Sequence, residues 1–380
     1  MAKKKTRKKA VTIEAPSVDL PAVPRVALDQ VVGHDRAVEV LMGAIRSGRL
    51  HHAWLFQGPL GVGKLTTAVA FAGILLDPTS RPNMAGVIEP DPGSPTQRLL
   101  ASGTHPDLHI VTKELARFSD DAQIRDRKLT NIPVEVVRER VLEPAAMSAS
   151  IRADARAKKV IIIDEAELLA HEGQNILLKT LEEPPAGTVI ILITSQAERL
   201  LPTIRSRCQR VTFGTLTDEE MRRWIEREAG REGSPIGSLG EGELADLLLI
   251  AEGSPGMALL AAETGMAAWP SIIEPKLADL DAGRPIPDLG RAMADLIGTW
   301  ASDWVDHHDG ASKEAANRAA ARHMIRLLAA HYRRALQGGA SDVASRAIET
   351  IAEVEPSTQM NIQAQFVFED LAARLSMLRS

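Results

Sequence analysis

The chain of 380 residues contains a single cysteine, Cys208, and only 3% aromatic residues. One cysteine excludes a disulfide framework and a thiolate zinc site, and it is typical of proteins from a reducing cytoplasm. No run of 18 or more apolar residues occurs and no apolar stretch follows the N-terminal charges, so neither a membrane span nor a secretory signal is expected. We therefore expect a cytoplasmic protein that makes no membrane contact, with a core built mainly of aliphatic side chains.

The first ten residues are rich in lysine and arginine, although the whole chain has a formal net charge of −5. The basic residues of this start are Lys3, Lys4, Lys5, Arg7, Lys8 and Lys9. The rest of the chain has a more negative net charge than the whole, which argues against its being the main DNA-binding surface. Residues 1–27 are typical of a solvated, disordered basic tail, and contact of this tail with nucleic acid is the alternative.

Short apolar segments alternate with helical patterns between residues 28 and 214. The expected strands are residues 53–56, 108–111, 160–163, 189–193 and 211–213, and the expected helices include residues 65–76 and 132–142. This alternation predicts a parallel sheet covered by helices on both faces. Five prolines mark residues 77–105 as a surface insertion. Beyond residue 214 only helical patterns remain, which predicts a small helical domain at 215–270 and an all-α domain at 271–380.

A phosphate-binding loop joins the first expected strand to the next helix. Residues 58–64, Gly-Pro-Leu-Gly-Val-Gly-Lys, have Walker A spacing, in which backbone N–H groups wrap a phosphate chain and Lys64 reaches the β- and γ-phosphates. Leu65 stands where a hydroxyl would ligate Mg²⁺, and Thr66 lies about 100° further around the helix and does not replace it. We expect weak binding of ATP or ADP with Mg²⁺ and little hydrolysis. The residues expected to hold the nucleotide are Gly58, Gly61, Gly63 and Lys64.

Two acids, Asp164 and Glu165, end the apolar strand expected at 160–163. In a nucleotide site, Asp164 would orient Mg²⁺ or its waters and Glu165 would polarise an attacking water. The alternative is a helix N-cap followed by a first-turn acid. The loop and the acid pair, in this order and on these elements, together indicate a P-loop fold.

Four stretches carry a resemblance to a known family. They are Leu-His-His-Ala-Trp-Leu-Phe-Gln-Gly-Pro at 50–59, Gly-Thr-His-Pro-Asp at 103–107, Asn-Ile-Leu-Leu-Lys-Thr-Leu-Glu-Glu-Pro-Pro at 175–185, and Thr-Ile-Arg-Ser-Arg-Cys at 203–208. Over residues 31–214 the chain resembles the clamp-loader branch of the AAA+ proteins and, within it, the delta-prime family of bacterial DNA polymerase III. The resemblance is weak beyond about residue 265.

The resemblance implies an α/β P-loop (AAA+) domain at 28–214, a small helical lid domain at 215–270 and a C-terminal helical collar at 271–380. It also implies a hetero-pentamer that contains ATPase motor subunits and a clamp-opening subunit. Collars hold such a ring together, ATP lies at subunit interfaces, and the ring closes a sliding clamp around primed DNA.

The resemblance also assigns roles to single residues. Arg207 matches the family's trans arginine finger, which stabilises charge on the γ-phosphate of a neighbouring subunit; a planar, always ionised guanidinium suits that task. The alternative is a surface arginine beside Arg205 and Arg210. Thr194 matches the sensor 1 position, and its alternative is a strand-end hydroxyl that satisfies backbone groups.

Three departures from the family pattern bear on activity. Leu65 is the first, and Gly256 is the second because it occupies the place of a sensor arginine. Residues 77–105 keep an insertion that in many relatives carries four cysteines, but they contain none, and His105 alone cannot build a zinc site. We therefore expect no zinc and no dedicated metal site, and a vestigial general base at Glu165, in a stator subunit that supplies Arg207 in trans. The alternatives are an autonomous ATP-hydrolysing motor subunit and a DNA-binding scaffold that uses the lysine-rich tail.

Overall fold

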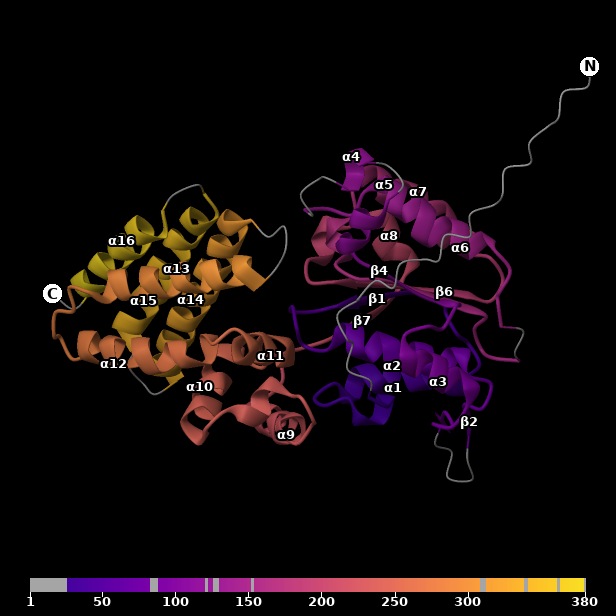
Figure 1. Cartoon of the computed structure of the whole chain (residues 1–380), viewed down its shortest axis with the longest axis horizontal. Coiled ribbons are helices and arrows are strands. Elements are labelled where there is room, and N and C mark those ends of the chain that lie inside the picture. The colour runs from indigo at the N-terminus through magenta and orange to yellow at the C-terminus, as the bar shows by residue number, and fades with distance from the viewer. Residues whose placement is uncertain are drawn as a thin grey trace, which may run out of the picture.

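The chain folds into an α/β half and an all-helical half, which lie at opposite ends of the view in Figure 1. The computed structural model describes residues 26–82, 88–119, 122–125, 130–151, 154–307, 312–337, 341–360 and 363–378. Nearly all of the expected basic tail, residues 1–25, lies outside the described residues. Within the described residues, no helix combines the length and apolar character that crossing a membrane requires.

Five parallel strands form the central sheet, in the order β4-β5-β6-β1-β7. Their bounds are β1 Ala53–Gln57, β4 Leu108–Val111, β5 Lys159–Ile163, β6 Thr188–Thr194 and β7 Gln209–Thr212. β5 and β6 are buried along their whole length, as continuous apolar strands inside a parallel sheet should be. The parallel α/β fold expected from the sequence is confirmed.

Helices cover both faces of this sheet (Figure 1). One face carries α1 Asp35–Arg46, α2 Lys64–Leu76 and α3 Pro95–Ser102. The other carries α4 Ala122–Arg125, α5 Val134–Val137, the π-helical turn η3 Arg138–Leu142, α6 Glu143–Ala146, α7 His171–Glu182 and α8 Pro202–Arg207. Alternate residues of β1 divide between the two resulting cores, with Trp54 and Phe56 in one and Leu55 in the other.

A carboxylate organises the insertion that follows α2. This segment contains α3 and a short hairpin of β2 Arg81–Pro82 and β3 Ile88–Glu89. Asp77, which is fully buried, accepts hydrogen bonds from the Thr79 and Ser94 hydroxyls, at 2.7 and 2.6 Å, and from the Gln97 amide at 3.0 Å. These bonds hold the pKa of Asp77 below its usual value even though burial alone would raise it. A hydrogen-bonded acid thus joins the two ends of the insertion.

The helical half shares one apolar core. Its helices are α9 Asp218–Ala229, α10 Glu241–Ala251, α11 Pro255–Glu263, α12 Trp269–Asp281, α13 Leu289–His307, α14 Lys313–Gln337, α15 Ser341–Val354 and α16 Ala364–Met377, with the short turns η6 Pro235–Ser238, η7 Met266–Ala268 and η8 Glu355–Gln359. A single cluster of buried apolar residues runs from Leu216 to Leu375. The lid boundary predicted at residue 270 therefore falls inside a continuous hydrophobic cluster.

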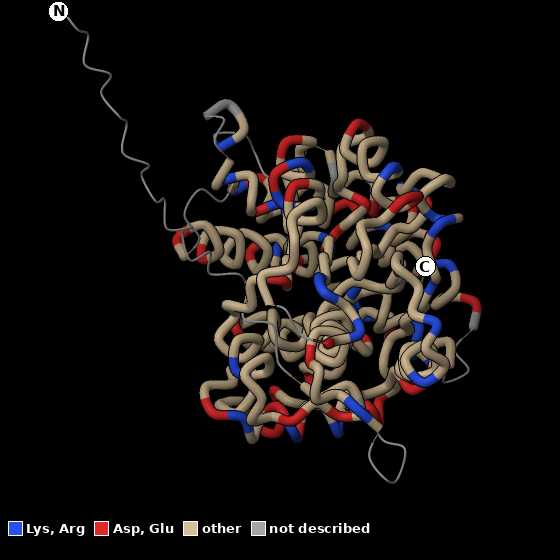
Figure 2. Tube along the Cα trace, turned by 90° about the vertical axis from the view of Figure 1, so that its right-hand side faces the viewer, with Lys and Arg blue, Asp and Glu red and all other residues tan. Residues whose placement is uncertain are grey.

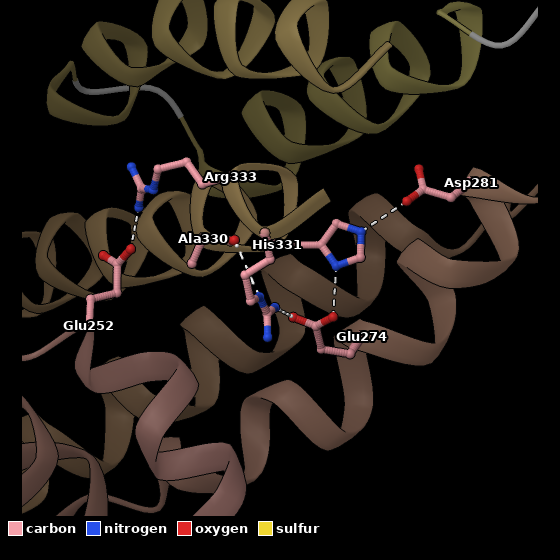
Figure 3. A network of polar contacts seen from close by, with 7 residues as sticks. Glu252, Glu274, Asp281, Ala330, His331 and Arg333 are labelled. Carbon is pink, nitrogen blue, oxygen red and sulfur yellow. Dashed lines mark hydrogen bonds and ion pairs between the residues drawn. The ribbon is translucent and has the colours of Figure 1, made fainter. Parts of the chain in front are cut away.

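A polar network also ties α10, α12 and α14 together (Figure 3). Arg333 on α14 pairs with Glu252, the C-cap residue that follows α10. Glu274 and Asp281, both on α12, contact His331 on α14. The ring nitrogens of His331 lie 2.7 Å from Glu274 Oε2 and 3.0 Å from Asp281 Oδ2. Burial alone would lower the pKa of His331, but its hydrogen bonds to these two acids raise it.

Charges of both signs are distributed over the surface. Figure 2 shows Lys and Arg interspersed with Asp and Glu along the trace, on the face that the α/β half presents.

Candidate phosphate-binding loop and surface arginine

The loop after β1 has the backbone form of a phosphate cradle. Gly58, Gly61 and Gly63 adopt φ values of 154°, 76° and 110°, and Gly63 is the residue immediately before α2. At Gly58 an added Cβ would lie 2.2 Å from the carbonyl oxygen of Phe213, so no other residue fits there. The N–H groups at the start of α2 are thereby left free to face an anion.

Lys64 is bound by its own loop. Its ammonium donates to the carbonyl oxygens of Gly58 at 2.7 Å and Pro59 at 2.5 Å, and the residue is 6% exposed. Burial lowers the pKa of Lys64 to about 8, against the opposing charges of Asp164 and Glu167. A phosphate that binds the Lys64 ammonium must replace its hydrogen bonds to the carbonyl oxygens of Gly58 and Pro59.

Asp164 and Glu165, the two acids after β5, lie in different environments. Burial raises the pKa of Asp164 to about 6, and its Oδ1 accepts the backbone N–H of Glu165 at 2.9 Å. Glu165 has a left-handed backbone, with φ at 47°, and forms an ion pair with Lys113 at 2.7 Å. No side-chain hydrogen bond from Glu165 caps the turn η4 Ala166–Leu168. The carboxylate expected to act as a general base is thus neutralised by a lysine from the polar segment after β4.

The first turn of α11 docks on the loop. The Gly256 N–H donates to the Gly61 carbonyl at 2.8 Å, and the Ser254 hydroxyl donates to the Leu60 carbonyl at 3.1 Å. A Cβ on Gly256 would lie 2.9 Å from the Cα of Gly61. Where the family pattern places an arginine, this chain therefore presents a backbone N–H in direct contact with the loop.

Thr194 ends β6 and is 1% exposed. Its hydroxyl accepts the backbone N–H of Gln196 at 3.0 Å, which is the contact expected of a strand-end hydroxyl. Next to it, Glu167 accepts hydrogen bonds from the Ser195 backbone N–H and hydroxyl, at 3.0 and 2.5 Å. Glu167 was not predicted from the sequence as a site residue, because its contact with Ser195 joins positions 28 residues apart.

Arg207 is the last residue of α8 and is partly exposed. Its guanidinium donates to the Thr203 carbonyl at 3.0 Å and pairs with Glu182 at 2.6 Å. Glu182 is the last residue of α7 and belongs to the stretch at 175–185, so two of the four stretches that carry the resemblance meet at this ion pair. The arrangement holds a planar donor at the surface of the α/β half.

A cleft of 1880 Å³ opens beside the loop. Its lining brings together Gly61, Gly63, Lys64 and Asp164. The described residues that line it do not include Gly58, Glu165, Thr194 or Arg207. Four of the expected site residues therefore share one cavity, and the expected finger lies outside the cavity of its own chain.

The residues present fit the phosphates of a nucleotide better than its metal. Lys64 and the N–H groups before α2 are suited to anionic oxygens. Of the two positions expected to contact Mg²⁺, Asp164 offers a carboxylate, but Leu65 contributes no oxygen. Within the described ranges there is no cluster of three or more His, Cys, Asp or Glu side chains able to hold a metal ion.

Known proteins share the α/β half. Residues 33–217 match the protein family described as DNA polymerase III, delta subunit. The chain is 32% identical over 181 residues to DNA polymerase III subunit delta' of Bacillus subtilis, which covers 48% of this chain and 47% of that protein. It is 32% identical over 204 residues to subunit delta' of Pseudomonas aeruginosa, with 54% and 53% covered.

The same α/β half is similar to a second type of subunit. Identity to DNA polymerase III subunit gamma/tau of Mycobacterium tuberculosis is 32% over 210 residues, which covers 54% of this chain and 31% of that protein. The chain thus spans about half the length of the delta' relatives and about a third of gamma/tau. Because the identities are equal, similarity alone does not separate the two subunit types.

Proposed function

We propose that this chain, whose residues 33–217 belong to the clamp-loader-type DNA polymerase III family, is a stator subunit that donates Arg207 to the nucleotide site of a neighbouring ATPase subunit. In this role it joins ATPase motor subunits and a clamp-opening subunit in a hetero-pentamer. The assembled complex, rather than this chain alone, places a sliding clamp on primed DNA.

The observation that carries the proposal is the outward placement of Arg207. The side chain lies outside its own P-loop cleft, at the exposed end of a helix, with Glu182 and Thr203 as its partners. An exposed ion pair contributes at most about 1 kcal/mol, so a triphosphate from another subunit can replace Glu182 at little cost. A bidentate guanidinium then meets the charge that develops on the γ-phosphate.

Four features in and beside the chain's own cleft favour a stator over a motor. Leu65 removes a metal ligand, and Lys64 is held by loop carbonyls. Glu165 is neutralised by Lys113, and Gly256 offers no charge to a phosphate. Together these features weaken metal placement, activation of water and charge stabilisation, on which phosphoryl transfer depends. Weak ATP or ADP binding without turnover is the behaviour we expect.

The trans role proposed for Arg207 can be tested in reconstituted complexes. In complexes whose only hydrolysis-competent subunit is the neighbour that receives Arg207, Arg207→Ala should lower the ATPase rate at least tenfold, since known arginine fingers contribute 10³ or more. Arg210→Ala is the matched control, because Arg210 is exposed on the adjacent strand β7. Equal ATPase rates in the two variant complexes would contradict the proposal.

The purified chain tests the motor alternative. Without partners, it should show no ATP turnover above background in the presence of Mg²⁺, and Lys64→Ala should change nothing. Robust turnover that Lys64→Ala abolishes would establish an autonomous ATPase and remove the stator proposal.

A further inference from the structure

We propose that α13 and α14 carry a binding site for single-stranded nucleic acid, formed by Arg318, Arg322 and Arg326 together with the paired indoles of Trp300 and Trp304. The site lies on the helical half, across the cleft from the phosphate-binding loop. It does not depend on the role proposed for Arg207.

The three arginines form a regular row. They are spaced four residues apart on α14, so they share one face of the helix at intervals of about 6 Å. All three line the cleft. Such a row matches a ligand that carries charge at regular intervals better than a single point charge.

No acidic partner neutralises this row among the described residues. Arg318, Arg322 and Arg326 take part in none of the ion pairs or hydrogen bonds of the described chain, whereas Arg333 and Arg334 on the same helix each pair with a glutamate. Burial and then the charges of Arg326 and Arg318 lower the pKa of Arg322, with only Glu355 opposing. The row therefore carries mutual repulsion that a bound polyanion would relieve.

Aromatic side chains border the row. The rings of Trp300 and Trp304 on α13 are stacked, with centroids 5.1 Å apart and planes 17° apart, and Trp304 is partly exposed. Trp300 and Trp304 line the same cleft as the arginines. A cationic row beside a flat indole is the arrangement on which single-stranded nucleic acids bind, through phosphate contacts and base stacking.

Two polar ring atoms beside the row have no hydrogen-bond partner. Trp300 Nε1 and His323 Nδ1 are buried and unpaired in the chain as described. Burial and then the charges of Arg326 and Arg322 lower the pKa of His323 to about 4, so the ring is neutral at pH 7 and can donate or accept. Because buried polar atoms are rarely left unpaired, these two atoms point to a ligand with polar edges as well as charge.

Other anions fit these observations less well. An acidic peptide would neutralise the arginines but has no flat rings to stack on Trp304. A free nucleotide would engage only part of the row, and the cleft of 1880 Å³ exceeds the size usual for a small-molecule pocket. In the cleft lining described, the acids are Asp164 and Glu228, and Glu228 pairs with Arg231. The wall as a whole is therefore positive.

Binding of a labelled oligothymidylate of about 20 nucleotides to the full chain, followed by fluorescence anisotropy, tests the site. The variant replaces Arg318, Arg322 and Arg326 by Gln. The matched control replaces Arg291, Arg346 and Arg374 by Gln, which removes the same charge from the helical half at arginines that are each paired with an acid. We expect at least a tenfold loss of affinity for the first triple and less than twofold for the control. The slope of log affinity against log salt should fall by about 2 for the first triple only.

A second comparison tests stacking. Trp304→Ala should weaken oligothymidylate binding several-fold, and an abasic oligonucleotide of equal length should bind the unmodified chain more weakly than oligothymidylate. Arg210→Ala, which removes an exposed charge from the α/β half, should leave the affinity unchanged.

Several results would overturn the inference. These are undetectable oligothymidylate binding, equal losses in the two triple variants, and equal affinity for oligothymidylate, the abasic strand and polyglutamate. If the first triple does not fold, the single change Arg326→Gln replaces it, and an unchanged salt slope for that variant would have the same meaning.

Discussion

Replacing Gly256 by Ala should separate α11 from the phosphate-binding loop. The new Cβ would lie 2.9 Å from Gly61 Cα and 3.1 Å from Gly61 O, and both are backbone atoms that cannot rotate away. Overpacking of this kind costs about 1–3 kcal/mol. Alanine in a helix recovers about 0.5–1 kcal/mol relative to glycine. The net expectation is a loss of about 0–2.5 kcal/mol in the free energy of unfolding, or about 1 kcal/mol at the midpoints of the two ranges.

Urea denaturation followed by circular dichroism measures this loss, and Gly298→Ala is the matched control. Gly298 lies inside α13 and an added Cβ would meet nothing within 4 Å, so this substitution should raise stability by about 0.5–1 kcal/mol. Hydrogen exchange of the amides in residues 58–64 should speed up in the Gly256 variant alone. A Gly256→Ala protein as stable as the unmodified chain, with unchanged exchange, would refute the docking described for α11.

Three further expectations concern other groups. Burial raises the pKa of Cys208 to about 12, so iodoacetamide at pH 8 should leave the native thiol unmodified and label it once urea unfolds the chain; rapid native labelling would contradict its burial. Because the folded pKa of His331 lies above 6.5, its contribution to stability is complete below pH 6.5 and is lost as pH rises through that pKa. The difference in unfolding free energy between the unmodified chain and His331→Gln should therefore shrink from pH 6 to pH 9, and a widening difference would refute the sign. Glu182→Gln should change the unfolding free energy by less than about 1 kcal/mol, since its pair with Arg207 is exposed, and a loss above 2 kcal/mol would show a structural role.

The strands were predictable because they are continuous apolar runs. Residues 108–111 form β4 as expected, β5 begins one residue earlier than predicted, and β6 extends the predicted segment by one residue at each end. β7 was placed two residues too late, because it is an edge strand on which only Val211 is buried. Ile132 was expected to begin a helix, but it forms a bridge to Leu169 and the helix begins at Val134 after Pro133.

In the insertion at residues 77–105, proline is compatible both with irregular surface structure and with the start of a helix. Its five prolines indicated irregular surface structure, but Pro95 is the first residue of α3 and Ser94 caps that helix. Proline is favoured at a first helical position because no hydrogen bond is lost there. The Ser-Pro pair therefore contained a helix signal that the count of prolines concealed.

At the site, the loop and Asp164 were predictable because their spacing along the chain fixes their place at the sheet edge. The partners were not predictable. Lys113 reaches Glu165 from a segment 52 residues away, and Gly256 meets Gly61 across nearly 200 residues. The first pairing depends on how distant segments of the α/β half come together and the second on how the two halves pack, and periodicity encodes neither.

The uninterrupted apolar cluster from Leu216 to Leu375 limits where the chain can be divided. Separating the pieces on either side of residue 270 would remove the neighbours of Ile273 and Leu277 of α12 and expose both parts of a single interior to water. Protease nicking at that point should leave the two pieces bound together on a sizing column. A break between Phe213 and Thr217, by contrast, should release an α/β unit and a helical unit that each keep an interior of their own.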